Sequence, residues 1–280
     1  MSTVTISAAD VNKLRKQTGA GMMDCKKALV EANGDFEAAV DYLRKKGQKV
    51  SASRSDRDAK EGAAKAYINN DATKGIVIEL NCETDFVAKN EDFVALTDSF
   101  GHAALNSDAK TIEEVLELTV DGMKIADLII DNIGKIGEKL QISNFEVLNA
   151  EQVVGYTHAG NKIGVLLSLS KSTSEEGVAL ARDIAMQIAA MRPIAVDRDG
   201  IDEATIERER TIAKEQILAE GKPANMVDKI AEGKLNKFFK ENTLVNQAFV
   251  KDNSKSVKQV LTDLDKDLHV VSFKRVELGA

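Results

Sequence analysis

An internal repeat constrains the fold of this 280-residue chain more than any other feature of its sequence. Tyr67 stands eight residues before Gly75, and Tyr156 stands eight residues before Gly164. A short polar turn precedes each glycine, and a run of β-forming residues follows it. Two β-type runs around a short turn are typical of a hairpin, so the repeat predicts a hairpin at the start of each half of a common core.

Each predicted hairpin is followed by a helix and is closed by a further strand. The helices are expected at 93–105 and 175–191, and the closing strands at 142–147 and 271–276. Each half is therefore predicted to have the order β-β-α-…-α-β, and we expect an α+β fold.

The first half of the core is expected at 63–150 and the second at 151–280. An insertion at 202–240 explains most of the extra length of the second half, and its pattern predicts two helices joined at Gly221-Lys222-Pro223. This helical hairpin has few large apolar side chains among many charges. We expect it to project as a coiled-coil-like element and to pack on another surface, such as a second copy of the chain.

Residues 1–47 are predicted to form a separate module of three short helices. Glycine turns end the first two helices, and the third is expected at 36–45, where Gly47 would stop it. Residues 48–62 are almost free of apolar side chains, so we expect a solvated linker there, with a partly helical segment as the alternative.

Composition and cysteine spacing exclude several classes of protein. The net charge is −7, which argues against a nucleic-acid duplex or a membrane surface as the main partner, because clustered Lys and Arg neutralise phosphates. Cys25 and Cys82 lie far apart in sequence, so we expect no disulfide framework and no metal site. No apolar run is long enough to span a bilayer, and we expect the chain in the cytoplasm.

Sequence motifs for enzyme chemistry are absent. There is no Walker-type phosphate loop, no dinucleotide fingerprint and no zinc-protease motif, and the histidines are isolated in sequence. We therefore predict a protein that is not an enzyme and has no cofactor, although a histidine could still meet a carboxylate in the fold. His158, at the end of a predicted strand, is a candidate contact residue whose alternative role is structural.

Two consecutive methionines, Met22 and Met23, follow the Gly-rich turn 18–21. Both side chains cannot point into so small a core, so we expect at least one on the surface, where flexible methionine suits apolar contacts. The alternative is that both pack beneath the turn, and residue type alone does not decide between the two.

The segment 81–90 leaves a buried strand and carries Phe86 and Val87 in succession. Consecutive side chains cannot both face the same core direction. A large apolar side chain on a loop, flanked by Asp85 and Lys89, has the form of a wedge for a partner's pocket. The alternative, that Phe86 folds back onto the sheet, is the one that residue type alone favours.

Two long runs, Thr18–Leu29 and Asn81–Lys89, carry a resemblance to a known family that covers nearly the whole chain. Shorter runs contribute to it at Leu14-Arg15, Ala32-Asn33-Gly34-Asp35, Ile136-Gly137-Glu138, Gly155-Tyr156-Thr157-His158, Ile163-Gly164-Val165 and Gly221-Lys222-Pro223. In this order they resemble the bacterial translation elongation factor Ts family.

The resemblance implies a ubiquitin-associated-like fold for the three-helix module, a core of two related α+β halves, and a helical hairpin that mediates dimerisation. It implies binding to the GTPase elongation factor Tu in its GDP form and faster release of GDP, so that GTP can rebind. Such a guanine-nucleotide exchange factor makes no covalent bonds. Arg15, Met22 and Met23 would touch the nucleotide domain of the GTPase.

The same resemblance gives the wedge a role. Within the segment Thr84, Asp85, Phe86 and Val87, the middle two residues would push into the nucleotide domain and disturb its magnesium and phosphate site. His158 would help to hold another domain of the GTPase.

Two expectations remain open at the level of sequence. Some members of the family carry a helix beyond the last strand, whereas this sequence ends at Ala280, so we expect that contact to be missing or replaced. The main alternative function is a non-catalytic adaptor or scaffold that docks through the N-terminal module and the 202–240 hairpin. The segment Thr84–Val87 separates the two functions, because a tether needs no wedge.

Overall fold

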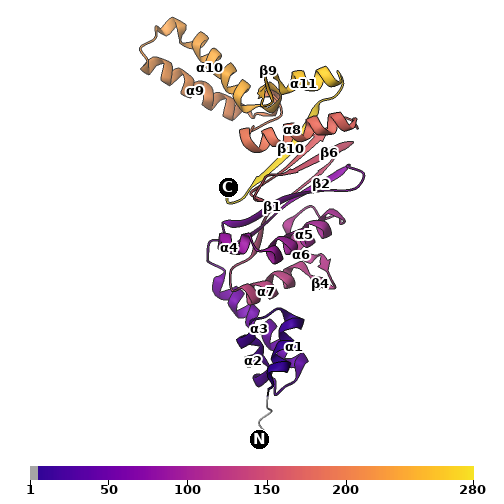
Figure 1. Ribbon diagram of the computed structural model, residues 1–280. Helices are drawn as coiled ribbons and strands as arrows, with labels where there is room; N and C mark the ends of the chain where they lie inside the picture. The colour runs from indigo at the N-terminus through magenta and orange to yellow at the C-terminus, as the bar shows by residue number, and fades with distance from the viewer. Residues whose placement is uncertain (1–5) are drawn as a thin grey trace.

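Two three-stranded antiparallel sheets, stacked on one another, form the centre of the chain, as the computed structural model of residues 6–280 shows (Figure 1). Sheet one contains, in spatial order, β1 (Glu61–Ile68), β2 (Lys74–Cys82) and β5 (Gln141–Asn149). Sheet two contains β10 (Val270–Glu277), β7 (Ile163–Leu169) and β6 (Gln152–Thr157). Each predicted half of the core supplies one sheet, and the predicted α+β class is confirmed.

Helices cover the outer face of each sheet (Figure 1). In the first half these are α4 (Asp85–Ala88), α5 (Glu91–Leu105), α6 (Ile112–Glu117) and α7 (Ile125–Ile136), with a small hairpin of β3 (Thr119–Val120) and β4 (Met123–Lys124). In the second half they are α8 (Glu175–Met191) and α11 (Val257–Leu264), with 3-10 turns η1 (Arg198–Gly200) and η3 (Leu244–Asn246) and short strands β8 (Ala248–Phe249) and β9 (Asp252–Ser256). Helix α8 has the predicted bounds, and the other predicted helix of the core lies within α5.

Glycines of the repeat lie where the two sheets touch. A Cβ atom at Gly164 would stand 2.7 Å from Val77 Cγ1, and one at Gly75 would stand 2.8 Å from Leu166 Cδ2. Contacts this short do not occur between real Cβ atoms and their neighbours, so only glycine lets the backbones of the two sheets approach so closely. The repeat that we found in sequence therefore marks the interface between the sheets.

The correspondence between the halves extends to an irregularity in strand pairing. The β2–β5 register shifts between Glu79 and Leu80, and the β7–β10 register shifts beside Ser168, four residues after the second repeat glycine. Polar side chains pair across the strands at both places, Glu79 with Asn144 and Ser168 with Ser272. The extra residue is Ser143 of β5 in one half and Val271 of β10 in the other, so each β-bulge lies in the closing strand, opposite the end of the central strand.

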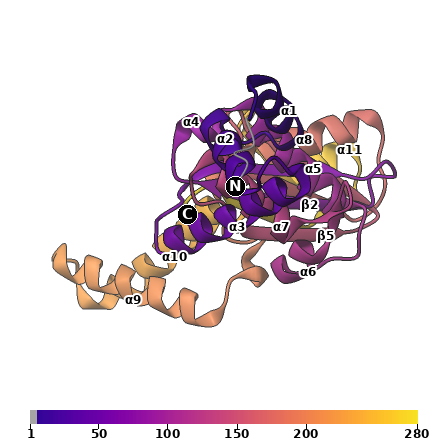
Figure 2. The ribbon, with the colours of Figure 1, turned by 90° about the horizontal axis from the view of Figure 1, so that it is seen from below.

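The insertion forms a helical hairpin that projects from the helical layer over sheet two, beside β9 and α11 (Figures 1 and 2). It comprises α9 (Glu203–Ala219), the short turn η2 (Ala224–Met226) and α10 (Val227–Asn242), so the two predicted helices are confirmed. Ala213 and Ile217 of α9 and Ala231 of α10 belong to the small core between the two helices. Because most of its surface faces solvent, the hairpin adds little to the stability of the body.

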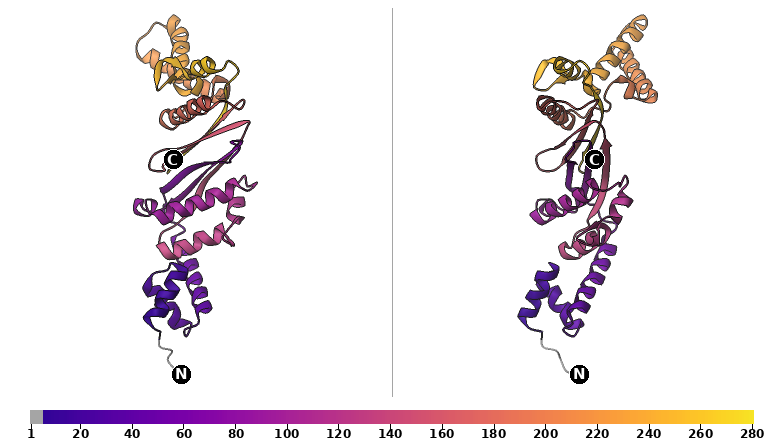
Figure 3. Two further views of the ribbon diagram at one scale, coloured as in Figure 1. Left: turned by 45° about the vertical axis from the view of Figure 1, so that its right-hand side comes forward. Right: turned by 90° about the vertical axis from the view of Figure 1, so that its right-hand side faces the viewer.

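The N-terminal module lies at the opposite end of the molecule from the hairpin (Figure 3). It contains α1 (Ala8–Thr18), α2 (Met22–Glu31) and α3 (Phe36–Arg54). Ser7 accepts a hydrogen bond from the Asp10 amide at 3.1 Å and the Asp10 carboxylate accepts one from the Ser7 amide at 3.2 Å, which caps α1. Its core is small and consists of Val11, Leu14, Ala20, Cys25, Ala28, Leu29 and Ala39.

Helix α3 is longer than the sequence pattern predicts. The expected end at Lys45, before Gly47, is wrong, because the helix continues to Arg54. Gly47 is buried where α3 crosses α7: a Cβ atom built on Gly134 would lie 2.9 Å from Gly47 Cα. The glycine therefore serves a close helix crossing instead of a helix end, and residues 55–60 connect α3 to β1.

We predict that Gly134→Ala destabilises the protein, because the added methyl group forces α3 and α7 apart. The expected loss is about 1–3 kcal/mol, the usual cost of overpacking, and it should lower the urea concentration at the midpoint of unfolding.

The matched control is Gly233→Ala in α10, where no atom lies within 4 Å of the added Cβ. This change should raise stability by about 0.5–1 kcal/mol through helix propensity. Equal effects of the two substitutions would contradict the role that we assign to the crossing.

Candidate partner-binding site

The segment that follows β2 forms one exposed helical turn. Residues Thr84–Val87, which we call the wedge turn, begin α4, and Thr84 Oγ1 accepts a hydrogen bond from the Val87 amide at 3.4 Å. Asp85 pairs with Lys89 at 2.6 Å, and this hydrogen bond lowers the pKa of Asp85. The Phe86 side chain is 84% exposed. The alternative that Phe86 folds back onto the sheet is therefore wrong.

The base of the wedge turn is held by Glu138, which follows α7. One Glu138 carboxylate oxygen accepts hydrogen bonds from the amides of Glu83 and Thr84, at 3.1 and 3.0 Å. The other accepts the Thr84 hydroxyl at 2.7 Å. In return, Glu83 accepts the amide of Lys139 at 2.7 Å. Each loop thus offers a carboxylate to backbone donors of the other, and we call this pair the reciprocal clamp.

Glu83 also ties the clamp to the end of α3. Arg54 and Arg57 donate to its two carboxylate oxygens at 2.7 and 3.0 Å. Burial disfavours the charged carboxylate, but the Lys139 amide and the two guanidinium groups outweigh it and lower the pKa of Glu83 to about 2. Lys139 Nζ in turn donates to the carbonyl of Ser55 at 2.7 Å, so the connection after α3 is fixed beside the wedge turn.

In the N-terminal module, both candidate methionines are exposed. Met22 is 51% and Met23 75% exposed, because Cys25 and Ala28 already fill the space beneath the start of α2. The alternative that both methionines pack beneath the turn is wrong. Arg15 is exposed as well, near the end of α1.

A groove of about 430 Å³ joins the module to the wedge turn. Gly19, from the turn before Met22, lines it on one side and Val87 on the other. Its floor and walls come from α5 and α7, and include Phe93, Leu96, Asn132, Lys135 and Ile136. Helices α2 and α4 accordingly lie on the same side of the molecule in Figures 1 and 2. The structure therefore brings together two segments that are about sixty residues apart in sequence.

His158 lies on sheet two, in the turn between β6 and β7, and is exposed. Its Nδ1 atom is 2.8 Å from the hydroxyl of Tyr156. Lys162 in the same turn pairs with Glu61 of β1 at 3.6 Å, and after Lys89 its charge also contributes to lowering the pKa of Asp85. This turn therefore lies near the wedge turn, with sheet one and its helices between it and the N-terminal module (Figure 1).

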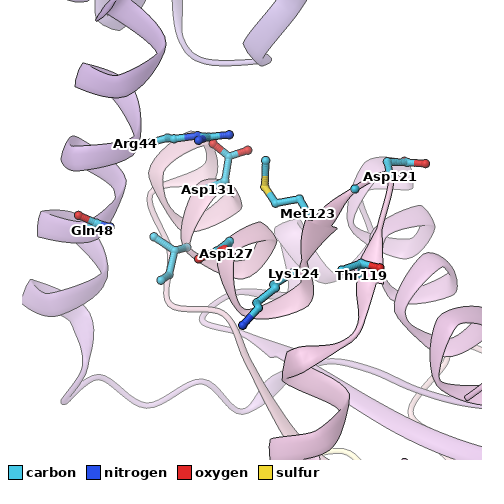
Figure 4. A pocket seen from close by; sticks show the side chains of 10 residues that line it. Arg44, Gln48, Thr119, Asp121, Met123, Lys124, Asp127 and Asp131 are labelled. Carbon is cyan, nitrogen blue, oxygen red and sulfur yellow. The ribbon is translucent and has the colours of Figure 1, made fainter. Parts of the chain in front are cut away.

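A second groove, of about 760 Å³, lies between α3 and the β3–β4 hairpin (Figure 4). Arg44 of α3 extends toward Asp131 of α7, whose carboxylate already pairs with Lys135 at 2.7 Å. Charges of both signs line the remaining wall, where Lys124 pairs with Glu117 at 2.6 Å. Because acidic and basic side chains alternate with Met123 and Ile130 in this lining, the groove presents neither a charge of one sign nor a continuous apolar surface.

The groups that could bind a metal ion or act as a nucleophile can be checked among the described residues. Within residues 6–280, no cluster of three or more His, Cys, Asp or Glu could hold a metal ion. Burial raises the pKa of the Cys82 thiol to about 12, so it stays protonated and is no nucleophile. In the same range, no helix is both long and apolar enough to cross a bilayer.

The clamp residues are the part of the site that sequence reasoning missed. Glu83 and Glu138 were visible only as charges beside a loop, and the bonds between their loops join positions 55 residues apart. A signal did exist, since both stand in runs that carry the family resemblance, but nothing in the runs indicates that they pair. Arg54 escaped notice because α3 was expected to end earlier.

Comparison with known proteins places the chain among relatives of one kind. The family described as Elongation factor TS matches residues 83–280. The chain is 55% identical over 274 residues to elongation factor Ts of Christiangramia forsetii, with 98% of this chain and 99% of that protein covered. It is 51% identical over 277 residues to that of Amoebophilus asiaticus, covering 99% and 100%, and 45% identical over 278 residues to that of Porphyromonas gingivalis, covering 99% and 100%. The chain therefore belongs to the elongation factor Ts family of translation elongation factors.

Proposed function

We propose that this chain is a guanine-nucleotide exchange factor for the GTPase elongation factor Tu. It binds the GDP form, disturbs the magnesium and phosphate site, and promotes release of GDP so that GTP can rebind. The observation that carries the proposal is the 84% exposure of Phe86 on a turn held at its base by the reciprocal clamp. An apolar side chain held out on a fixed turn is suited to insertion into a partner.

The physical basis of exchange is differential binding. An exchange factor binds the nucleotide-free GTPase more tightly than the GDP-bound form, and by linkage GDP must then weaken the binding of the factor by an equal ratio. Phe86 enters an apolar gap in the nucleotide domain and displaces the elements that position the magnesium ligands. Magnesium requires near-ideal octahedral coordination, so a small displacement releases the ion and leaves the phosphate charge poorly neutralised.

The N-terminal module supplies affinity to the same partner. Arg15, Met22 and Met23 contact the nucleotide domain, and the groove that links Gly19 to Val87 makes that contact continuous with the wedge turn. His158 and Tyr156 contact another domain of the GTPase from sheet two. Contacts on both sides of the wedge turn hold Phe86 against its target.

The helical hairpin is the proposed surface for a homodimer. Ile212, Leu218 and Met226 of the hairpin are 39%, 55% and 45% exposed, and a second copy of residues 202–240 would cover them. Phe86 lies on the other half of the core, so dimerisation leaves the wedge turn free (Figure 1).

Exchange itself is tested with elongation factor Tu loaded with labelled GDP. Phe86→Ala should lower the GDP release rate at saturating factor by about tenfold or more, the cost of truncating an aromatic side chain at the centre of an interface. Stopped-flow fluorescence gives the rate, and circular dichroism checks that the variant is folded.

The matched control for Phe86→Ala is Val271→Ala, because Val271 is an apolar residue of sheet two that is also exposed, at 55%. This control should release GDP like the unaltered chain. An unaltered chain that binds the GTPase without speeding release would instead support the adaptor function.

Replacement of both Met22 and Met23 by Ala should weaken binding and leave the maximal rate of release nearly unchanged. The half-saturating concentration of factor should rise by about tenfold, because apolar contact area is lost while the wedge turn is intact. Met191→Ala is the control, since Met191 is 52% exposed on α8. Unaltered affinity of the double variant would remove the module from the interface.

Dimerisation is tested by sedimentation velocity over a range of protein concentrations. Leu218→Glu should shift the chain toward the monomer, because it places a charge in the apolar contact. Lys222→Glu, in the turn between the helices, changes charge by more but removes no apolar side chain and should have a smaller effect. A chain that stays monomeric at all concentrations before any substitution would overturn the dimer.

A further inference from the structure

We infer that Glu138 is a positioning residue for nucleotide exchange, which acts by holding Phe86 in the orientation that the partner meets. The inference rests on the proposed function. Glu138 does not belong to the exposed contact surface; it lies behind the wedge turn and binds its first residues.

The wedge turn cannot orient itself. Helix α4 has four residues, and its internal bonds are limited to those of a single turn, such as Ala88 amide to Thr84 carbonyl at 3.2 Å. A single helical turn is unstable alone, because nucleation fixes several backbone dihedrals for one hydrogen bond. The capping bond from the Val87 amide to Thr84 Oγ1 is long, at 3.4 Å. The order of the turn must therefore come from residues outside it.

Glu138 supplies that order through three bonds to two consecutive residues. Its carboxylate binds the amides of Glu83 and Thr84, which fixes the backbone at the entry of the turn. It also accepts a hydrogen bond that the Thr84 hydroxyl donates, which leaves the lone pairs of Thr84 Oγ1 available to the Val87 amide. A single carboxylate thus sets both the backbone and the cap of the segment that carries Phe86.

The support behind Glu138 is rigid. Gly137 ends α7 in a left-handed conformation, with φ 80°, and its amide binds the Ile133 carbonyl at 2.8 Å. Ile125, Ile129 and Ile133 of α7 are buried in the core of the first half. The position of Glu138 is therefore fixed by a packed helix, as a precise binding site requires.

The clamp also couples the two contact surfaces. Glu83 binds the Lys139 amide and the guanidinium groups of Arg54 and Arg57, so the far end of α3 meets the same pair of loops. Helix α3 is the third helix of the N-terminal module, and the exposed methionines begin α2 of the same module. Phe86 and the methionines are consequently held in one geometry before the partner arrives, which reduces the ordering cost of binding.

The chemistry of the clamp predicts a graded set of variants. Glu138→Gln keeps one oxygen for the two amides, and its NH2 group can donate to one lone pair of Thr84 Oγ1 and leave the other for the Val87 amide, so it should retain most of the activity. Glu138→Ala removes all three bonds. Glu138→Asp keeps the charge but is shorter and cannot reach the amides. We therefore expect Glu138→Asp to have the same loss of activity as Glu138→Ala. If only the charge of Glu138 mattered, Glu138→Asp would be as active as the unaltered chain.

The first measurement uses the free chain and needs no partner. Amide hydrogen exchange of residues 83–88, followed by mass spectrometry, should be faster in Glu138→Ala and close to normal in Glu138→Gln. Unchanged protection of this segment in Glu138→Ala would overturn the positioning role even if the proposed function is correct. If Glu138→Ala fails to fold, Thr84→Val takes its place, because it removes only the hydroxyl and should loosen the same segment.

The second measurement is GDP release from elongation factor Tu at varied concentrations of factor. Glu138→Ala should lower the maximal rate by about tenfold, the loss expected for hydrogen bonds to a charged group, with a smaller change in the half-saturating concentration. Glu138→Gln should restore the rate. If the unaltered chain fails to speed release, the proposed function itself is wrong, and this outcome differs from a defect confined to the variant.

A double substitution separates positioning from general stability. If Glu138 acts only through Phe86, the variant Phe86→Ala, Glu138→Ala should release GDP no more slowly than Phe86→Ala alone. If the losses in GDP release rate of the two single variants instead multiply in the double variant, Glu138 acts by another route and the inference is overturned.

Discussion

The arrangement of this protein depends on the close crossing of α3 and α7. Gly47 and Gly134 face one another there, and the missing side chains let the two helix backbones touch. This crossing attaches the N-terminal module to the core and directs the end of α3 toward the base of the wedge turn. Gly19 consequently comes next to Lys135, where a Cβ at Gly19 would stand 3.6 Å from the lysine side chain, and the groove toward Val87 is closed on that side.

An exposed phenylalanine needs a physical reason in a chain whose other phenylalanines are all buried or half-buried. Burial of Phe86 against the sheet would contribute about 1.5–3 kcal/mol to folding, which the protein forgoes. That free energy remains available for association, where it acts only if the side chain is already oriented. The Thr84 cap and the carboxylate of Glu138 provide that orientation at the cost of few residues. The exposure of Phe86 and the fixed geometry of its turn are thus both needed for the same contact.

Local patterns predicted much of this fold, and long-range pairing accounts for what they missed. The repeat, the bounds of α8 and the two helices of the insertion follow from periodicity and short-range signals. Gly47 was misread because a glycine at a helix crossing has the same local signature as a glycine after a helix end. The candidate residues Phe86, Met22 and Met23 could be chosen from sequence, yet their exposure could not, since it depends on what fills the core beneath them.

The two halves of the core show how one scaffold supports different functions. In each half the central strand leaves the sheet opposite a bulge in the closing strand, and its exit lies beside the loop that precedes that closing strand. In the second half these loops are joined by Lys171 and Asp265 at 2.6 Å, and the Ser170 amide donates to the His269 carbonyl at 3.0 Å. That exposed ion pair joins two side chains and no backbone group, and it contributes little to stability. In the first half, carboxylates bind backbone amides instead, so they can impose a helical turn on the exit. The reciprocal clamp, more than the repeated fold, therefore explains why the strand exit of the first half forms an exposed helical turn.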